Sequence, residues 1–526
     1  MITEINETAP GVIPDAEPVR ELIVVARPQA GLRAMGTDVS STTGADVGAL
    51  SLVLDDAGAR MEPLFGSSEE QVRALGTVPG GIDLSLFYRV TADDHRLDEL
   101  ARVIGVQGAV DAAYVKPAAY LPALYLGQKP RRAHPPAVTP DFSQRQGYLF
   151  AAPQGVDALH AWTRPGGGGL GVRVVDVEGG WTFSHEDLRE RQGGVIAGAE
   201  RSGPYVRSHG TAVAGIVGGD ANGYGVMGIS PDAVVSGASI HPRGTAYAIR
   251  AAADPLAPGD VILLALHRPG PAVAFDNPGD PFGWMAVEWW PDDFAAIRYA
   301  TSRGIVVVQA AGNGSQDLDD AMYDAHPPAP YGPFPSWWSN PFRRGPLDSG
   351  AILVGAGAPP QGTHGRDLWG PDRSRLGWSC YGSVVDAQGW GYEATTTGWY
   401  GDLQGGPDET RWYTDGFAGT SAAAPMVAGA VACVQGALNA AGRPMLTPLE
   451  ARGLLRATGT PQQDGPAGPA SQRIGNRPDV REMLSLLLPY EACELITVPT
   501  RSLAPFADGF PLPFTAAEEF AGAGAT

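Results

Sequence analysis

The chain has 526 residues, of which 44% are hydrophobic and 18% are charged. This balance is typical of a folded protein and excludes a disordered one, and the length allows more than one domain. The formal net charge of −20 argues against nucleic acid or an anionic membrane as the main partner, because their phosphate groups would be repelled.

The cysteines and the N-terminus bear on the compartment. Cys380, Cys433 and Cys493 are too few and too widely spaced for a disulfide framework or a zinc site, and at most one disulfide can form. The first residues are acidic and no apolar segment follows them, so we expect no secretory signal peptide. We find no run of about 18 apolar residues and expect no membrane-spanning helix. These observations favour a cytoplasmic protein or one exported by a non-Sec route.

The N-terminal part predicts a flexible arm over residues 1–20 and a small domain over residues 21–117. Apolar residues at helical spacing predict helices around Leu50 and Leu100. Alternating with them, three strands are predicted at Glu21–Pro28, Leu84–Val90 and Ala109–Lys116. This order predicts an α+β domain with an open-faced, ferredoxin-like sheet.

The rest of the chain predicts a linker, a large domain and a tail. Residues 118–145 are rich in proline and contain a basic cluster, which indicates an extended linker or a structured loop of the next domain. From residue 146 to 490, helical segments alternate with runs that are apolar on both faces, namely Gly171–Val177, Ala233–Ile240, Asp260–Leu266, Gly304–Ala311 and Ala351–Ala356. Such runs indicate a buried, mainly parallel sheet, so we expect a doubly wound α/β fold with helices on both faces. Residues 491–526 show no periodicity and are expected to form a C-terminal tail.

Three segments carry residues suited to catalysis. Asp176 follows an apolar strand, at the edge where open α/β sheets place their sites, although a lone acid there is more often a cap. His209 begins a run of very small residues, which predicts a closely packed helix with the histidine in its first turn. Thr420 or Ser421 is predicted at the N-terminus of another small-residue helix, where the backbone N–H of the serine can stabilise an oxyanion.

Together these segments resemble the subtilase family of serine peptidases over residues 145–490. GTSAAAPMVAGA around Ser421 is close to the serine motif of the family, and HGTAVAG around His209 is close to its histidine motif. The order Asp, His, Ser is that of subtilisin. The resemblance implies a serine endopeptidase in which Ser421 attacks the peptide carbonyl, His209 transfers the proton and Asp176 orients the imidazole, with no cofactor required for the chemistry.

The same resemblance implies further residues of the site. Asn313 corresponds to the asparagine of the oxyanion hole. The substrate, a protein or peptide, would add as a strand to one cleft edge and would place the residue before the cut against the opposite wall. The edge is Leu264, Ala265 and Leu266, and the wall is Ala310, Ala311 and Gly312.

The N-terminal domain resembles the inhibitory propeptide of the family. It would assist folding, act as an intramolecular inhibitor of the cleft and be cut within residues 117–145. A permanent accessory domain is the alternative. For the whole chain, the alternative to an enzyme is a subtilase-fold binding or scaffold protein that no longer cuts.

Several residues depart from the family pattern. Glu178 adds a carboxylate near the triad, where it could shift a neighbouring pKa, bind a cation or point to solvent. A sedolisin-type glutamate base is the alternative, which the intact histidine motif disfavours. His267 replaces a glycine after the cleft edge and Ala265 replaces a serine, so substrate preference does not carry over from the family. The segment 275–293, with its three tryptophans, is predicted to pack on the surface rather than to overhang the cleft.

Calcium sites are frequent in the family and need oxygen ligands. Asp187 and Asp386 are candidate ligands, but no ligand-spacing motif assigns a site. A structural calcium ion is therefore an unassigned expectation.

Overall fold

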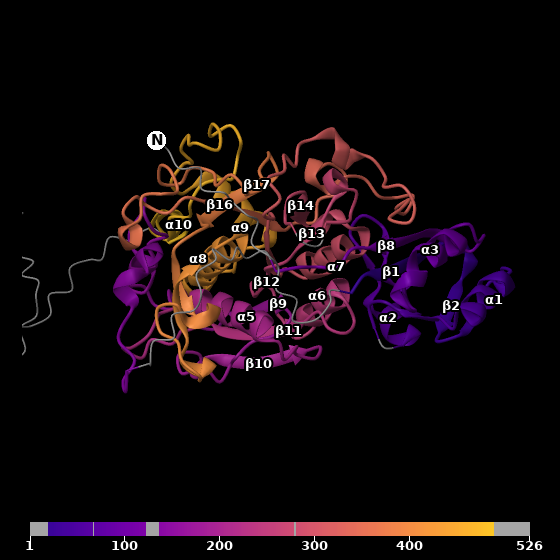
Figure 1. Ribbon diagram of the computed structural model, residues 1–526, viewed down its shortest axis with the longest axis horizontal. Coiled ribbons are helices and arrows are strands. Elements are labelled where there is room, and N and C mark those ends of the chain that lie inside the picture. Colours follow the sequence, from indigo (N-terminus) through magenta and orange to yellow (C-terminus); the bar gives the residue numbers. More distant parts are fainter. Residues whose placement is uncertain (1–18, 67, 122–135, 278–279, 489–526) are drawn as a thin grey trace, which may run out of the picture. The chain divides into compact units, whose positions relative to one another are not determined.

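The computed structural model describes residues 19–66, 68–121, 136–277 and 280–488 (Figure 1). The described residues up to Leu488 belong to one unit. The predicted tail, most of the predicted arm and much of the predicted linker lie outside the described residues.

The N-terminal segment folds around a four-stranded antiparallel sheet with the order β4-β7-β1-β8. Its strands are β1 (Glu21–Ala26), β4 (Arg60–Pro63), β7 (Phe87–Thr91) and β8 (Val110–Lys116), and its main helices are α1 (Gly48–Ala57) and α3 (Leu97–Gly105). Helix α1 connects β1 to β4, and α3 connects β7 to β8, which is the predicted ferredoxin-like arrangement. Smaller elements that the sequence did not predict are β2 (Leu32–Met35), β3 (Asp38–Ser41), α2 (Glu69–Leu75), β5 (Thr77–Val78) and β6 (Ile82–Asp83).

The large sheet confirms the predicted doubly wound α/β fold. Seven parallel strands are ordered β10-β11-β9-β12-β15-β16-β17. They are β9 (Arg173–Glu178), β10 (Gln192–Ala197), β11 (Val234–Ser239), β12 (Val261–Leu264), β15 (Val306–Ala310), β16 (Ile352–Gly357) and β17 (Val385–Trp390). The order reverses beside β9, and crevices outside the carboxyl ends of strands form at such a switch point.

Alternate residues of each strand enter different cores, because successive side chains of a strand point to opposite faces. Val174 packs in a core with α5 (Pro204–Gly218) and α8 (Thr420–Ala440), whereas Val175 packs with α6 (Thr245–Ala253) and α7 (Pro291–Ser302). Short helices α4 (Ala158–Ala161), α9 (Pro448–Ala457) and α10 (Val480–Leu487) join the first core. The remaining strands form two antiparallel pairs, β13 (His267–Pro269) with β14 (Trp284–Ala286) and β18 (Ala394–Thr397) with β19 (Tyr413–Phe417).

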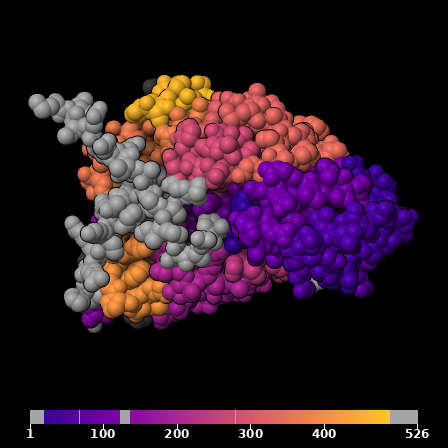
Figure 2. All heavy atoms as spheres, turned by 45° about the vertical axis from the view of Figure 1, so that its right-hand side comes forward, coloured from indigo at the N-terminus to yellow at the C-terminus, as the bar shows by residue number. Residues whose placement is uncertain are grey.

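The N-terminal sheet packs against α6 and α7. Its residues Ile23, Val25 and Tyr114 share one buried core with these helices, so the open face of the sheet is covered. The segment that carries this sheet is drawn in indigo to violet in the ribbon and space-filling views (Figures 1 and 2). Backbone contacts join the same parts, including a hydrogen bond of 2.8 Å from Val115 N to Pro330 O.

Helix α8 bears on the expectation that no helix spans a membrane. Within the described residues it is long and apolar enough to span a bilayer, although no such stretch was expected from the sequence. Its most apolar 18-residue stretch is entirely buried inside the protein, as in the core helix of a globular domain. Cys433 lies in this helix and is a free, buried thiol, and Cys380 is free and buried as well.

Candidate active site

The carboxylate that contacts His209 belongs to Glu178, not to Asp176. Glu178 Oε2 lies 2.6 Å from His209 Nδ1, and both side chains are fully buried. Strand β9 continues to Glu178, one residue beyond its predicted end. Asp176 and Glu178 are two residues apart and face the same side, so the later carboxylate lies nearer the carboxyl edge of the sheet. The expected contact of Asp176 with the imidazole is therefore corrected.

His209 and Ser421 meet as the motifs predicted. The Nε2 atom of His209 lies 2.9 Å from Ser421 Oγ, and neither residue is exposed. Helix α5 begins at Pro204, which places His209 in its second turn rather than its first. The small residues after His209 are needed for packing, because a Cβ on Gly215 would lie 2.3 Å from Thr397 Oγ1.

Asn313 is held beside the N-terminus of the serine helix. Helix α8 begins at Thr420, after Gly419 with a φ of 103°. The backbone N and the Oγ1 of Thr420 donate to Asn313 Oδ1 at 3.0 and 2.9 Å. These bonds assign Oδ1 to the Thr420 side, so Nδ2 is the end of the amide that can donate to a substrate oxygen. First-turn N–H groups have no acceptor within their helix, so Ser421 N–H is a second donor for that oxygen.

The two acids form a buried carboxyl pair on β9. Burial raises the pKa of both well above the usual range, and the Glu178 charge raises the pKa of Asp176 further. Among the described residues, Asp176 Oδ1 and Glu178 Oε1 are buried without a hydrogen-bond partner. Trp181 Nε1 donates to Asp176 Oδ2 at 2.8 Å. Burial lowers the pKa of His209 to about 3, so the imidazole is neutral and can accept a proton from the serine.

The residues of the predicted cleft are buried on adjacent strands. Leu264, Ala265 and Leu266 end β12 and follow it, and Ala310, Ala311 and Gly312 end β15 and follow it. These strands are neighbours in the large sheet. The next residue, His267, pairs in an antiparallel bridge with Tyr120 through two backbone hydrogen bonds of 3.0 and 3.1 Å.

The tryptophans of the segment 275–293 pack inside the protein, whereas packing on the surface was predicted. Trp289 and Trp290 are fully buried and pack edge-to-face on each other and on Phe334. Trp284 is also buried, but it contacts Tyr120 and His267 at ring-centroid distances of 4.2 and 4.6 Å. One of the three therefore reaches the cleft edge.

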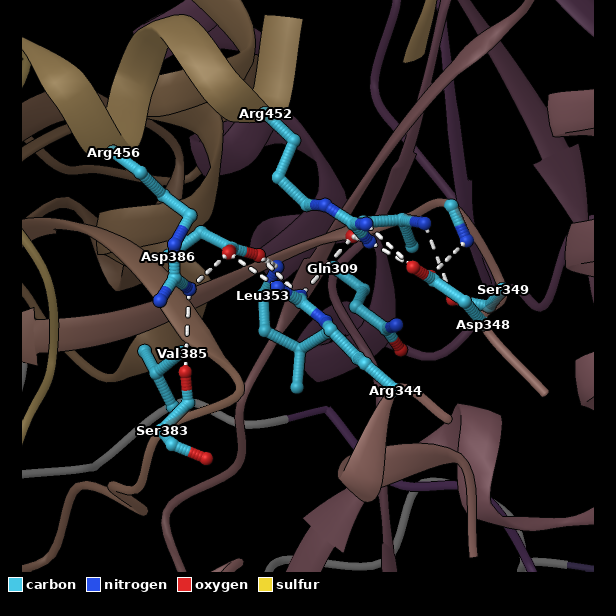
Figure 3. Close-up of polar contacts among 12 residues, drawn as sticks. Gln309, Arg344, Asp348, Ser349, Leu353, Ser383, Val385, Asp386, Arg452 and Arg456 are labelled. Atoms are coloured by element: carbon cyan, nitrogen blue, oxygen red, sulfur yellow. Dashed lines mark hydrogen bonds and ion pairs between the residues drawn. The ribbon is translucent and has the colours of Figure 1, made fainter. Parts of the chain in front are cut away.

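The two candidate calcium ligands are engaged by protein donors. Asp386 accepts hydrogen bonds of 2.7 Å from both Arg344 and Arg456, and its Oδ2 also accepts from the Leu353 amide at 2.9 Å (Figure 3). The guanidinium groups supply the positive charge that a cation would otherwise bring. Asp187 accepts from Asn222 Nδ2 and Val226 N at 2.7 and 2.6 Å. Among the residues with described positions, no group of three acidic, histidine or cysteine side chains is arranged to hold a metal.

Comparison with known proteins decides the family. The model of the subtilase family of peptidases matches residues 154–475, which is more than half of the chain. The chain belongs to the subtilase family.

Individual relatives of this subtilase are distant. Subtilisin BL from Lederbergia lenta is 30% identical over 150 residues, which cover 28% of this chain and 49% of that protein. Alkaline elastase YaB from Bacillus sp. (strain YaB) is 26% identical over 270 residues, covering 51% of this chain and 55% of that protein. The chain thus spans about half the length of the curated relatives it matches. A solved structure of proteases from Pseudoalteromonas arctica PAMC 21717 is 20% identical with a TM-score of 0.43, covering 66% of this chain and 99% of that one.

Three site residues of this subtilase were not assigned from the sequence. The contact of Glu178 with His209 follows from the alternation of side chains along β9, but only once the end of that strand is known. Thr420 precedes the serine within its motif, and its helix-start position indicates a polar contact that only the fold identifies as Asn313. Trp181 has no sequence signal beyond its closeness to Asp176.

Proposed function

We propose that this subtilase is a serine endopeptidase whose catalytic residues are Ser421, His209 and Glu178. The observation that carries the proposal is the series of hydrogen bonds from Ser421 Oγ to His209 Nε2 and from His209 Nδ1 to Glu178 Oε2. A serine hydroxyl is a weak nucleophile near neutral pH, and an adjacent base held by a carboxylate is the arrangement that activates it. Membership of a peptidase family agrees with this chemistry.

The proposed reaction follows from the roles of these groups. His209 Nε2 takes the proton as Ser421 Oγ bonds to the substrate carbonyl carbon, and it later gives that proton to the leaving amine. Glu178 accepts from Nδ1–H, which keeps Nε2 free as the base and stabilises the imidazolium. The Nδ2 group of Asn313 and the Ser421 N–H would bind the oxyanion, and loss of one such donor typically costs about 3–4 kcal/mol in the transition state. Water then hydrolyses the acyl-enzyme by the same proton transfers.

Asp176 has a positioning role in this proposal. It is the acid of the pair that carries a proton, because burial and the Glu178 charge raise its pKa, and its Oδ2 accepts from Trp181 Nε1. Glu178 thereby stays the carboxylate of the pair, with its Oε2 directed at the histidine. The rival hypothesis, a binding protein of the same fold, has no use for a serine, base and carboxylate joined in this order.

We further propose that the protein processes itself. The segment that leaves β8 runs along the cleft edge, where Tyr120 pairs with the backbone of His267 as a bound peptide strand would. The N-terminal segment would in this way occupy its own cleft until it is cut. The chain beyond Leu121 enters residues 122–135, where we place the cut.

Self-processing is tested by the fate of the full chain. Wild-type protein is expected to be cut within residues 122–135, and Ser421→Ala is expected to remain intact, because the nucleophile of the cut is its own serine. Intact-mass spectrometry during prolonged incubation measures both, with the exposed Ser485→Ala as the matched serine control. Cleavage of purified Ser421→Ala at the same bond, or wild-type protein that never shortens, contradicts the proposal.

A further inference from the structure

The side chain of His267 bridges the two sides of the proposed cleft. His267 belongs to β13, on the side of the edge residues, and it is 1% exposed. Its Nδ1 accepts a hydrogen bond of 3.2 Å from the backbone N–H of Asn313, on the opposite side. This bond requires Nδ1 to be unprotonated, and burial together with the nearby His209 lowers the pKa of the imidazole well below its usual value. The ring is therefore a neutral, fixed part of the wall.

Strand β14 fills the space on one side of the imidazole. The Trp284 ring packs edge-to-face on the imidazole, with a centroid distance of 4.6 Å. The backbone of β14 also lies against the segment that follows β15. A Cβ added to Gly312 or Gly314 would lie 2.8 or 2.1 Å from Trp284 O.

A substrate side chain would have to enter this filled space. Tyr120 shows the register of a strand on the cleft edge, and its ring lies 4.2 Å from the Trp284 ring, on the face where the imidazole also lies. Side chains two residues apart on a strand face the same way, so the residue two positions after one paired with His267 has its side chain on the face that carries the imidazole. The imidazole is bonded to Asn313, the proposed oxyanion donor. The residue whose carbonyl is attacked therefore has its side chain next to His267.

We propose that His267 restricts the residue before the cut to glycine or alanine, by filling the volume that a larger side chain would need. This inference rests on the proposed function, and it makes peptide bonds that follow small residues the substrate class. A filled site binds a substrate more weakly when methylene groups are added to its side chain. An opened pocket binds the substrate more tightly for each methylene group that it buries.

The test is a P1 series of peptide p-nitroanilides, identical except for Gly, Ala, Leu or Phe at the residue before the cut. We expect wild-type protein to prefer Ala over Phe by at least about 100-fold in kcat/KM, and His267→Ala to shift this ratio at least about tenfold towards Phe. His267→Asn, which is smaller but keeps an acceptor for Asn313 N–H, is expected to shift it in the same direction. His185→Ala removes a buried histidine outside the cleft and should leave the ratio unchanged. The ratio is independent of the fraction of active molecules.

Two results overturn the inference. One is wild-type cleavage after Phe or Leu as fast as after Ala, and the other is an unchanged ratio in both His267 variants.

A separate readout distinguishes these from failure of the proposed function, namely binding of carboxylate-terminated peptides ending in Ala or Phe to Ser421→Ala, with and without His267→Ala. Tighter binding of the Ala peptide that disappears in the His267→Ala variant supports the inference even if no peptide is hydrolysed. Equal binding of the two peptides to Ser421→Ala, or no binding, contradicts it. The bound Tyr120 segment competes with every peptide alike and cancels from the ratio.

Discussion

Glu178→Gln is expected to lower kcat/KM for peptide hydrolysis about 10⁴-fold, the scale on which an amide in place of the triad carboxylate acts. Glutamine keeps the volume but lacks the charge that stabilises the imidazolium, and its NH₂ can reverse the tautomer of His209. Asp176→Asn is the matched control, because asparagine keeps the volume and its amide oxygen can still accept from Trp181 Nε1. That change affects about one hydrogen bond, so we expect a loss of roughly fivefold. Steady-state kinetics with active-site titration measures both.

The ranking of the two acids decides the assignment. Equal losses in the two variants would mean that the carboxyl pair acts as one unit with no preferred partner for His209. A large loss of kcat/KM in Asp176→Asn alone would assign the catalytic role to Asp176. That result would contradict the geometry, in which His209 Nδ1 is bonded to Glu178. Circular dichroism of each variant checks that the fold is retained.

The second large effect is expected at a buried charge cluster between the N-terminal sheet and α7. Lys116 Nζ lies 3.0 Å from Asp293 Oδ1 and 3.4 Å from Glu21 Oε1, and it also contacts Asp292. Arg268 is paired with Asp293 and Glu21 at 3.1 Å each. Both cations are fully buried, and the acids that they pair are also buried. The cluster therefore depends on complete pairing.

Lys116→Met is expected to lower the free energy that holds the N-terminal sheet in place by about 3–5 kcal/mol. Methionine keeps most of the volume, but Asp292 and Asp293 lose a cation while they remain buried, and an uncompensated buried charge is costly by this amount. Hydrogen exchange of the Val115 amide measures the change in the opening free energy, since this amide bonds across to Pro330 O. The Ser421→Ala background prevents cutting during the measurement.

A surface ion pair supplies the control for this experiment. Arg60 and Glu62 are 3.8 Å apart, with side chains 67% and 46% exposed. Exposed pairs contribute at most about 1 kcal/mol, so Arg60→Met should change the opening free energy little. If Lys116→Met changes it equally little, the buried cluster does not hold the sheet.

The elements that the sequence predicted well are those with buried β-branched runs. Strands β9, β11, β12, β15 and β16 fall within the predicted runs or within one residue of them, because their side chains are apolar on both faces. Strand β10 was missed because it lies at the edge of the sheet, contains two glycines and is largely exposed. Strand β17 was missed because Asp386 and Gln388 interrupt its apolar pattern, and in the fold both are buried and hydrogen-bonded.

The candidate site was predictable where long motifs place one residue on a known element. His209 and Ser421 meet as expected because each lies in a helix of small residues that packs closely on the sheet. The acid was assigned to Asp176 because the order of motifs does not distinguish two carboxylates on one face of a strand. His267 was recognised as unusual, but its bond to Asn313 depends on a contact between β13 and the segment that follows β15, which no local pattern reports.

Fluorophosphonate labelling tests whether Ser421 is an activated nucleophile, because the reagent bonds to a serine that a neighbouring base activates. We expect one label per chain, located at Ser421 by peptide mass spectrometry of the purified protein after prolonged incubation. We also expect His209→Ala and Glu178→Gln to slow the labelling strongly. An unlabelled Ser421 in the wild-type protein, or labelling at an unchanged rate without His209, would contradict a serine peptidase built on these three residues.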